Sequence, residues 1–514
     1  MPRAHSSIIF GIYMTSLRIR LLIPAVLLLV AILACTGGAT GTGGHVTPVG
    51  TSYATATLPA FPTTEPSRTP TPTVAFTPLA PLSPGETLLY RIQSGDTLDL
   101  LAQRFAVPLA DLLSLNNLAA GDALTPDEIL FIPARLDGTG LDFKIAPDSE
   151  LVYSLGASSF DTVRFVEERG GYLAHYREFV RGAMRSGGEI VQMAALDNSI
   201  NPRILLAILD YQSGWVSNSQ DPVEKVYPIG YRNSARNGLF GQLDWLADTL
   251  NLGYYRWRDG SVSAIDFPDG TQQRIHPALN SGSVAVQFLF SRLYNEQDWA
   301  QAVGPQGLYA AYNALFGNPF DKAFDPLIPK GLTQPDLALP FVPGREWLFI
   351  SGPHAAWEPG SPWAALDFAP PSMEGGCVKS DEWVAAPVAG LVVRSGDGVV
   401  VLDLDGDGRE QSGWAIVMLH VAAESRVPAG RTVEVGDPIG HPSCEGGRAT
   451  GTHVHIVRKF NGEWIPADGP VPFNLGGWVA HFGAREYKGT MTKGSDTITA
   501  CECSAEVSGI SSDR

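Results

Sequence analysis

Two histidines, His453 and His455, stand one residue apart in a run whose other members, Val454, Ile456 and Val457, favour a β-strand. Residues i and i+2 of a strand point to the same face of a sheet, so both imidazoles face the same space. Two neutral imidazoles on one face are a common way to hold a zinc ion. Two exposed histidines are the simpler interpretation of a bare His-x-His, so the assignment depends on partners elsewhere in the chain.

Candidate partners occur upstream, on either side of a Pro- and Gly-rich loop. His354 follows Gly352-Pro353, and Asp367 stands in an otherwise apolar run. An unpaired carboxylate in such a run is costly to bury, and metal coordination removes that cost. A catalytic zinc site needs three protein ligands. We therefore expect His354 and Asp367 to lie beside His455; the alternative for Asp367 is a side chain turned outward at a strand end.

From Pro340 onwards the chain consists of short β-branched runs cut by Gly and Pro. This pattern of short strands and turns predicts an antiparallel, mostly β domain. The expected strands span residues 383–394, 398–404, 414–421, 431–439 and 453–460.

Three alternating acids, Asp403, Asp405 and Asp407, match the start of a calcium-binding loop. Trp414 stands where such a loop has its last acidic ligand, and no helices are expected on either side. A hairpin turn is therefore expected, with calcium binding at 403–408 as the alternative.

The segment 345–482 resembles the lysostaphin and staphylolysin (β-lytic) type of zinc endopeptidase, which cleaves peptides of bacterial cell walls. Many relatives place the first zinc ligand four residues before the aspartate, where this chain has Trp363. The staphylolysin branch draws that histidine from further upstream, as at His354. The resemblance therefore implies that His354, Asp367 and His455 bind one Zn2+.

The same resemblance implies two catalytic histidines, His420 and His453. A zinc hydrolase also needs a group that moves protons and a group that stabilises the oxyanion. We assign His453 as the general base and His420 as the general acid or oxyanion stabiliser, with the two roles open to exchange. His441, followed by Pro442, is expected to be a structural loop histidine.

The N-terminal sequence predicts that the mature protein is located outside the cytoplasm. Basic residues precede the apolar run 21–34, which is shorter than the roughly 20 residues that span a bilayer and so favours a signal peptide over 1–34. Cys35 after a small residue resembles a bacterial lipobox, which implies lipidation and a membrane anchor; ordinary secretion is the alternative. The start can be Met1 or Met14.

The chain has five cysteines. If Cys35 carries lipid, four remain, an even number that fits an oxidising compartment. We expect a disulfide between Cys377 and Cys444, with two unpaired thiols as the alternative. The pairing of Cys501 and Cys503 is left open.

Residues 35–86 form a Thr- and Pro-rich tract that cannot build a core and is expected to be a linker. The following segment, 87–135, opens with Tyr-x-Ile-x-x-Gly-Asp-Thr-Leu from Tyr90 to Leu98 and resembles a LysM domain. The resemblance implies a small βααβ module that binds N-acetylglucosamine-containing glycans such as peptidoglycan. A βααβ domain without a ligand is the alternative. The expected strands are 89–92 and 128–132, and the expected helices are 98–105 and 109–115.

Residues 145–335 carry apolar positions at helical spacing. The run 201–214 resembles a helix of lysozyme-like lytic transglycosylases, but Gln212 replaces the glutamic acid that donates a proton there. We expect a lysozyme-like helical domain without catalysis, used for glycan binding or spacing; a generic helical spacer is the alternative. The expected helices include 190–196, 202–209, 283–294 and one that starts at 307.

With 514 residues the chain is too long for one core, and its net charge of -17 argues against nucleic acid as a partner. The resemblances together imply a multidomain zinc endopeptidase that cleaves peptidoglycan peptides, and we expect it to be a monomer. One rival is a non-catalytic wall-binding scaffold or regulator, and another is glycan cleavage by the helical domain. The C-terminal tail, 483–514, offers no functional signal.

Overall fold

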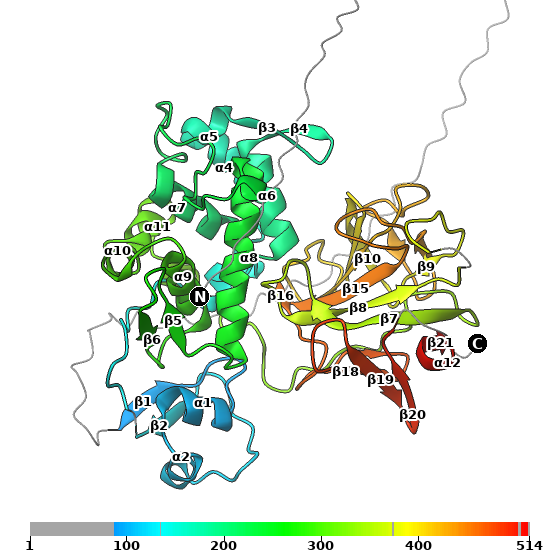
Figure 1. Cartoon of the computed structure of the whole chain (residues 1–514), viewed down its shortest axis with the longest axis horizontal. Coiled ribbons are helices and arrows are strands. Elements are labelled where there is room, and N and C mark those ends of the chain that lie inside the picture. Colours follow the sequence, from blue (N-terminus) through cyan, green and yellow to red (C-terminus); the bar gives the residue numbers. More distant parts are fainter. Residues whose placement is uncertain (1–86, 134, 373–374, 502–504, 512–514) are drawn as a thin grey trace, which may run out of the picture. The chain divides into compact units, whose positions relative to one another are not determined.

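The computed structural model describes residues 87–133, 135–372, 375–501 and 505–511. The expected signal peptide, the lipidation site Cys35, the Thr/Pro-rich linker and Cys503 lie outside the described residues. Along the chain, Figure 1 colours a small module blue, a helical region cyan to green and a β-rich domain yellow to red. Among the helices described, none combines the length and the apolar character needed to cross a bilayer.

The first module has the expected βααβ order. Its elements are β1 (Leu88–Arg91), α1 (Leu98–Phe105), α2 (Leu109–Asn116) and β2 (Ile129–Ile132). β1 and β2 pair antiparallel, with Leu88 opposite Ile132. The side chain of Thr97 accepts from the amide of Leu100 and starts α1, and Ala106 ends it in the left-handed conformation.

The second part, the helical region, contains the four helices expected from periodicity. Its helices are α3 (Asp148–Leu151), α4 (Thr162–Arg169), α5 (Tyr172–His175), α6 (Gly187–Asn198), α7 (Pro202–Ser213), α8 (Gly238–Arg258), α9 (Ser281–Ser291), α10 (Glu296–Ala302) and α11 (Leu308–Phe316). Two hairpins interrupt them: β3 (Arg177–Val180) with β4 (Ala183–Ser186), and β5 (Ala264–Asp266) with β6 (Gln272–Arg274). Ser186 and Glu189 form a capping box that fixes the start of α6.

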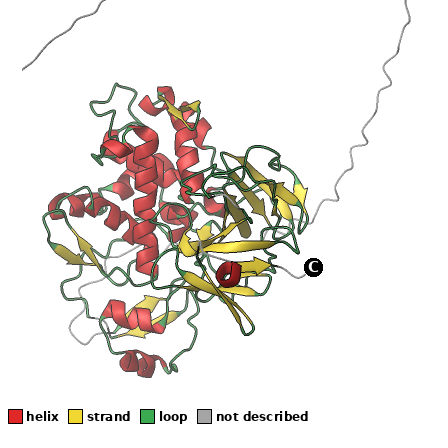
Figure 2. Cartoon of the chain, turned by 45° about the vertical axis from the view of Figure 1, so that its right-hand side comes forward, coloured by secondary structure: helices red, strands yellow, loops and turns green. Residues whose placement is uncertain are grey.

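The third part, the β domain, is antiparallel as expected (Figure 2). Its strands are β7 (Glu346–Ala355), β8 (Trp363–Ala369), β9 (Val384–Ala385), β10 (Gly390–Gly396), β11 (Val399–Asp403), β12 (Trp414–Leu419), β13 (Thr432–Val433), β14 (Pro438–Gly440), β15 (Val454–Phe460), β16 (Glu463–Trp464), β17 (Asn474–Leu475), β18 (Trp478–Phe482), β19 (Gly489–Lys493), β20 (Asp496–Thr499) and β21 (Gly509–Ser511), with α12 (Ala505–Ser508) before the last. The main sheet runs in the order β13-β10-β11-β12-β15-β8-β7-β21, and β16 pairs with β15.

Two expected strands are each split. The run 383–394 becomes β9 and β10, because Pro387 between them has no N–H to donate to a ladder. The run 431–439 becomes β13 and β14, because Gly436 adopts a φ of 86° and turns the chain.

The segment expected to be a tail contains further strands. β19 and β20 extend a second sheet in the order β17-β18-β19-β20, and β21 pairs with the edge strand β7. These strands are short and rich in Thr and Gly, so their sequence carries little apolar signal. The β domain therefore continues beyond residue 482.

The main sheet is buried on both faces. Val399 and Val401 of β11 belong to a core that also contains Tyr254 and Tyr255 of α8. Val400, on the opposite face of the same strand, belongs to a separate core within the β domain. A strand buried on both faces reads as a continuous apolar run, which explains why β11 shows no alternation. The helical region thus covers one face of the sheet that carries the histidines.

Candidate metal centre

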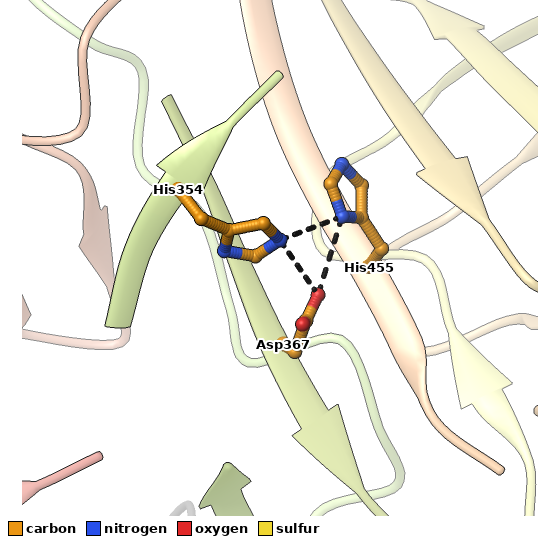
Figure 3. Close-up of side chains that lie close together, drawn as sticks. All are labelled: His354, Asp367 and His455. Carbon is orange, nitrogen blue, oxygen red and sulfur yellow. Dashed lines mark hydrogen bonds and ion pairs between the residues drawn. The ribbon is translucent and has the colours of Figure 1, made fainter. Parts of the chain in front are cut away.

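Three side chains from neighbouring strands converge in the β domain (Figure 3). His354 lies near the end of β7, Asp367 in the middle of β8 and His455 near the start of β15, directly opposite Asp367 in the strand register. His354 Nε2 lies 3.0 Å from His455 Nδ1, and Asp367 Oδ1 lies 3.3 Å from the first nitrogen and 3.2 Å from the second. All three side chains are buried.

The other ring nitrogens fix the protonation of both imidazoles. His354 Nδ1 donates to the carbonyl of Gly352 at 2.9 Å, and His455 Nε2 donates to the carbonyl of Ala356 at 3.1 Å. A carbonyl only accepts, so these nitrogens carry the protons and the two facing nitrogens carry lone pairs. Asp367 Oδ1 has no hydrogen-bond partner among the described residues. Three acceptors therefore face one another with no donor between them.

This arrangement fits a cation. Ligands held about 2.0–2.1 Å from a tetrahedral zinc ion lie about 3.3 Å from one another, which matches the separations in this cluster. Burial opposes ionisation of Asp367, whereas positive charge on the neighbouring imidazoles of His354 and His453 would hold the pKa of its carboxyl well below the usual range. A metal ion would supply that charge and leave the facing imidazole nitrogens unprotonated. Two imidazoles and one carboxylate with hydrogen-bonded outer nitrogens form a donor set that suits zinc.

The two expected catalytic histidines lie beside this cluster. His453 Nδ1 donates to the carbonyl of Gly451 at 2.8 Å, and His453 Nε2 lies 3.8 Å from Asp367 Oδ1. His420 follows β12 in the left-handed region, with a φ of 64°, and its Nδ1 donates to the carbonyl of Glu445 at 2.7 Å. The two ring centroids lie 4.4 Å apart. Burial, together with the neighbouring histidines, lowers the pKa of His420 to about 3.

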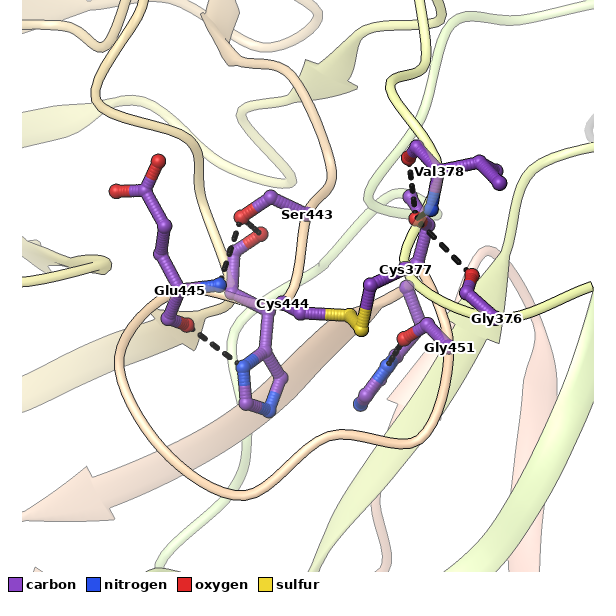
Figure 4. Close-up of a disulfide and its surroundings, with 10 residues drawn as sticks. Gly376, Cys377, Val378, Ser443, Cys444, Glu445 and Gly451 are labelled. Carbon is purple, nitrogen blue, oxygen red and sulfur yellow. Dashed lines mark hydrogen bonds between the residues drawn. A yellow bond between two sulfur atoms is a disulfide. The ribbon is translucent and has the colours of Figure 1, made fainter. Parts of the chain in front are cut away.

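A disulfide joins Cys377 and Cys444, as expected, and connects the loops around these histidines (Figure 4). On one side, Val378 donates its amide to Thr452 Oγ1 at 2.9 Å. On the other, the hydroxyl of Ser443 donates to the carbonyl of His420 at 2.9 Å. The bridge therefore links the segment before His453 to the segment that orients His420.

The cluster opens into a cleft of about 1800 Å3. The helical region contributes to its lining with Arg181, Phe240 and Asp244. Tyr487, which the sequence did not indicate, lies with its ring stacked on that of His354 at a centroid distance of 4.7 Å. It belongs to the segment expected to be a tail, and a single aromatic residue among weak strands gives no signal of such a contact.

Three further residues considered in the sequence analysis lie outside the metal cluster. His441 is not among the residues lining the cleft; its Nδ1 donates to the carbonyl of Glu382 at 2.8 Å and its ring lies against Trp383, so the structural interpretation is confirmed. Asp403 accepts backbone amides within the loop between β11 and β12, which confirms the hairpin turn. Calcium binding at 403–408 remains the alternative. In α7, Gln212 accepts a hydrogen bond from the hydroxyl of Tyr294.

Comparison with known protein families identifies two parts of the chain. Residues 90–133 match the LysM domain, which confirms that expectation. Residues 144–328 match the LasA N-terminal domain. This second match covers the helical region, whose lysozyme-like character stays a prediction.

Relatives of known name match a longer part of the chain than either domain family. Protease LasA of Pseudomonas aeruginosa strain UCBPP-PA14 is 24% identical over 351 residues, which cover 64% of this chain and 78% of the relative. The protein of the same name from strain PAO1 gives the same values. The chain is a homologue of protease LasA that carries a LysM domain.

Solved structures are also similar to parts of the chain. The M23 metalloprotease pseudoalterin is 22% identical, with a TM-score of 0.28, and the match covers 32% of this chain and 96% of that one. The catalytic domain of lysostaphin from Staphylococcus simulans is 22% identical, with a TM-score of 0.18, and covers 24% of this chain and 89% of that one.

Proposed function

We propose that this protein is a zinc-dependent endopeptidase that hydrolyses peptide bonds of bacterial cell-wall peptidoglycan. The observation that carries the proposal is the convergence of three buried acceptor atoms, on His354, Asp367 and His455, beside two further histidines in an open cleft. Homology to a protein named as a protease supports the reaction class. The LysM domain supports peptidoglycan as the substrate.

In this proposal His354, Asp367 and His455 hold one zinc ion. When bound, zinc supplies a Lewis acid that polarises the scissile carbonyl and makes an attacking water more acidic. The carbonyls of Gly352 and Ala356 keep both ligand imidazoles in the tautomer that presents a lone pair to the ion.

The other two histidines move protons. The carbonyl of Gly451 holds the proton of His453 on Nδ1, which leaves Nε2 as the basic nitrogen beside the metal ligands. We assign His453 as the general base that takes a proton from the water at Nε2. We assign His420 as the general acid or oxyanion stabiliser, with the two roles open to exchange. Burial lowers the pKa of its ring to about 3, so His420 is neutral near pH 7 and must acquire a proton on Nε2 during the reaction before it donates one.

The LysM domain would hold the enzyme on its polymeric substrate and so raise the local concentration of cleavable peptides. Such a protein acts outside the cytoplasm, either anchored by lipid at Cys35 or secreted. We expect the protein to be a monomer. We expect no nucleic-acid partner, because the net charge of -17 disfavours phosphate binding. The rival function, a non-catalytic wall-binding scaffold, gives no reason for the two further histidines to stand beside the cluster.

The test is the chemistry of the products. Digestion of peptidoglycan of defined composition should release fragments with new amino and carboxyl termini, identified by mass spectrometry, and His453→Ala should abolish their release. The position of those termini names the bond that is cut. New reducing or anhydro-sugar ends that persist in His453→Ala would instead assign cleavage of glycan to the helical region.

A further inference from the structure

The loop between β7 and β8, residues 356–362, takes part in setting the state of His455. Its first residue, Ala356, is fully buried, and its carbonyl accepts the proton of His455 Nε2 at 3.1 Å. This hydrogen bond keeps Nδ1 of His455 unprotonated and turned toward His354 and Asp367. Displacement of the Ala356 carbonyl would release that proton and allow the other tautomer.

Hydrogen bonds within the loop connect its two ends and brace its tip. Ala356 donates its amide to the carbonyl of Pro362 at 3.0 Å. Trp357 donates to the hydroxyl of Ser361 at 2.9 Å, and Ser361 donates its amide to the carbonyl of Glu358 at 2.9 Å. A shift imposed on the far side of the loop is therefore transmitted to Ala356.

That far side is held by α8 of the helical region and by the turn before this helix. From α8, Asp248 Oδ1 accepts the amide of Gly360 at 2.6 Å. From the preceding turn, Arg236 Nη2 lies 3.5 Å from Glu358 Oε2. The approach is close enough to require glycine, because a Cβ at position 360 would lie 2.0 Å from the carbonyl oxygen of Asp248. The loop is thus fixed against a helix from another part of the chain.

We infer that Asp248 is a positioning residue of the metal centre: through Gly360 and the β7–β8 loop, it holds the Ala356 carbonyl against His455. This inference rests on the proposed function, since it takes His455 to be a zinc ligand. The helical region would then help to form the metal centre, and it also lines the cleft with Arg181 and Phe240. A helical region that served only as a spacer would not affect metal binding.

Full-length variants test the inference. Asp248→Ala removes the acceptor for the Gly360 amide, Asp248→Asn keeps an oxygen in its place, and Gly360→Ala forces the loop off the helix. Gly396→Ala is the matched control, because a Cβ there meets nothing within 4 Å. Zinc affinity is measured by competition with a chelator, and thermal unfolding shows whether each variant is folded.

Loss of an outer hydrogen-bonding partner typically weakens metal binding about 10–100-fold. We expect about a tenfold rise in the zinc Kd for Asp248→Ala and Gly360→Ala, recovery to within about threefold of wild type for Asp248→Asn, and no change for Gly396→Ala. A zinc Kd of folded Asp248→Ala equal to that of wild type would overturn the inference. If Gly360→Ala does not fold, the two Asp248 variants decide.

A second readout does not depend on the metal. In metal-free protein, 15N–1H spectra of the histidine rings report which nitrogen of His455 is protonated, with its signals assigned by their loss in His455→Gln. We expect the proton on Nε2 in wild type and Asp248→Asn, and a mixture of tautomers in Asp248→Ala. A wild type that shows this tautomer but binds no zinc would refute the proposed function, whereas an unchanged tautomer in Asp248→Ala would refute the positioning role.

Discussion

His354 Nε2 and His455 Nδ1 face each other at 3.0 Å although the second nitrogen of each ring already donates to a main-chain carbonyl. Two lone pairs at this distance repel unless a positive charge lies between them. Asp367 Oδ1, which has no hydrogen-bond partner among the described residues, completes a set of three acceptors that suits a cation. The zinc assignment depends on this relationship.

His420 and His453 should contribute to the rate without contributing to metal binding. Replacement of either by alanine should lower kcat for peptidoglycan peptides by at least about 100-fold, because a positioned proton carrier contributes about 10²–10⁴. Zinc content should stay at the wild-type level, as measured by elemental analysis of the same preparations. Loss of zinc from either variant would make that histidine a ligand instead.

The disulfide should matter for both stability and rate. Cys377 and Cys444 are 67 residues apart in sequence, and closing a loop of that length stabilises a fold by about 4 kcal/mol in the chain-entropy model. The double variant Cys377→Ser/Cys444→Ser should unfold at a lower temperature and lose activity, because the Glu445 carbonyl would no longer fix His420. Zinc content should not change. Calorimetry and activity assays check the two effects, and an active variant of unchanged stability would contradict them.

A buried carboxyl at the contact between the helical region and the sheet should make stability depend on pH. Glu463 Oε1 lies 3.2 Å from Arg258 Nη1, yet burial raises the pKa of Glu463 from 4.5 to about 7. The folded state therefore keeps a proton that the unfolded chain loses between these values. The protonated Glu463 contributes fully to the free energy of unfolding below pH 4.5. This contribution is lost as the pH rises through 7, and the free energy of unfolding falls by at most about 3 kcal/mol.

The Tm of wild type should accordingly fall between pH 5 and pH 8 more steeply than that of Glu463→Gln, which cannot titrate at this position. Differential scanning calorimetry across this range measures both slopes. Glu434→Gln, at an exposed position, is the control and should keep the wild-type slope. Equal slopes for Glu463→Gln and wild type would show that Glu463 titrates normally.

The helical region and the β domain should stay together after the chain between them is cut. Trp464 donates its amide to the hydroxyl of Tyr255 at 3.0 Å, Arg394 lies 3.2 Å from Asp197, and both regions share one apolar core. A protease site inserted after the exposed Gly331 should yield two fragments that co-elute in gel filtration and separate only in denaturant. Fragments that separate under native conditions would contradict the shared core.

Local patterns predicted the local structure well. The helix over 98–105 was expected with its observed bounds, because a helical pattern directly follows the turn at 94–97. The strand of His455 was expected because β-branched residues surround the histidine. The two split strands were not, because they depend on one proline and one glycine turn whose effect the apolar runs obscure.

The site could be predicted only in part. His354 was a candidate from its place upstream of Asp367, but the choice of His354 over position 363 came from a family resemblance, because no spacing rule reaches across the loop between His354 and Asp367. Tyr487 was missed because it lies among Thr-rich strands with little apolar signal. The continuous apolar run of β11 is typical of a strand buried on both faces. It does not indicate that the helical region is what packs against one of those faces.

The central claim is that His354, Asp367 and His455 together hold zinc. Elemental analysis of purified full-length protein should find about one equivalent of zinc in wild type and less than about 0.2 in each of His354→Ala, Asp367→Ala and His455→Ala. His441→Ala, the matched control outside the cleft, should keep about one equivalent. Full zinc content in any of the three ligand variants would contradict the assignment of that residue, and its persistence in all three would contradict the site.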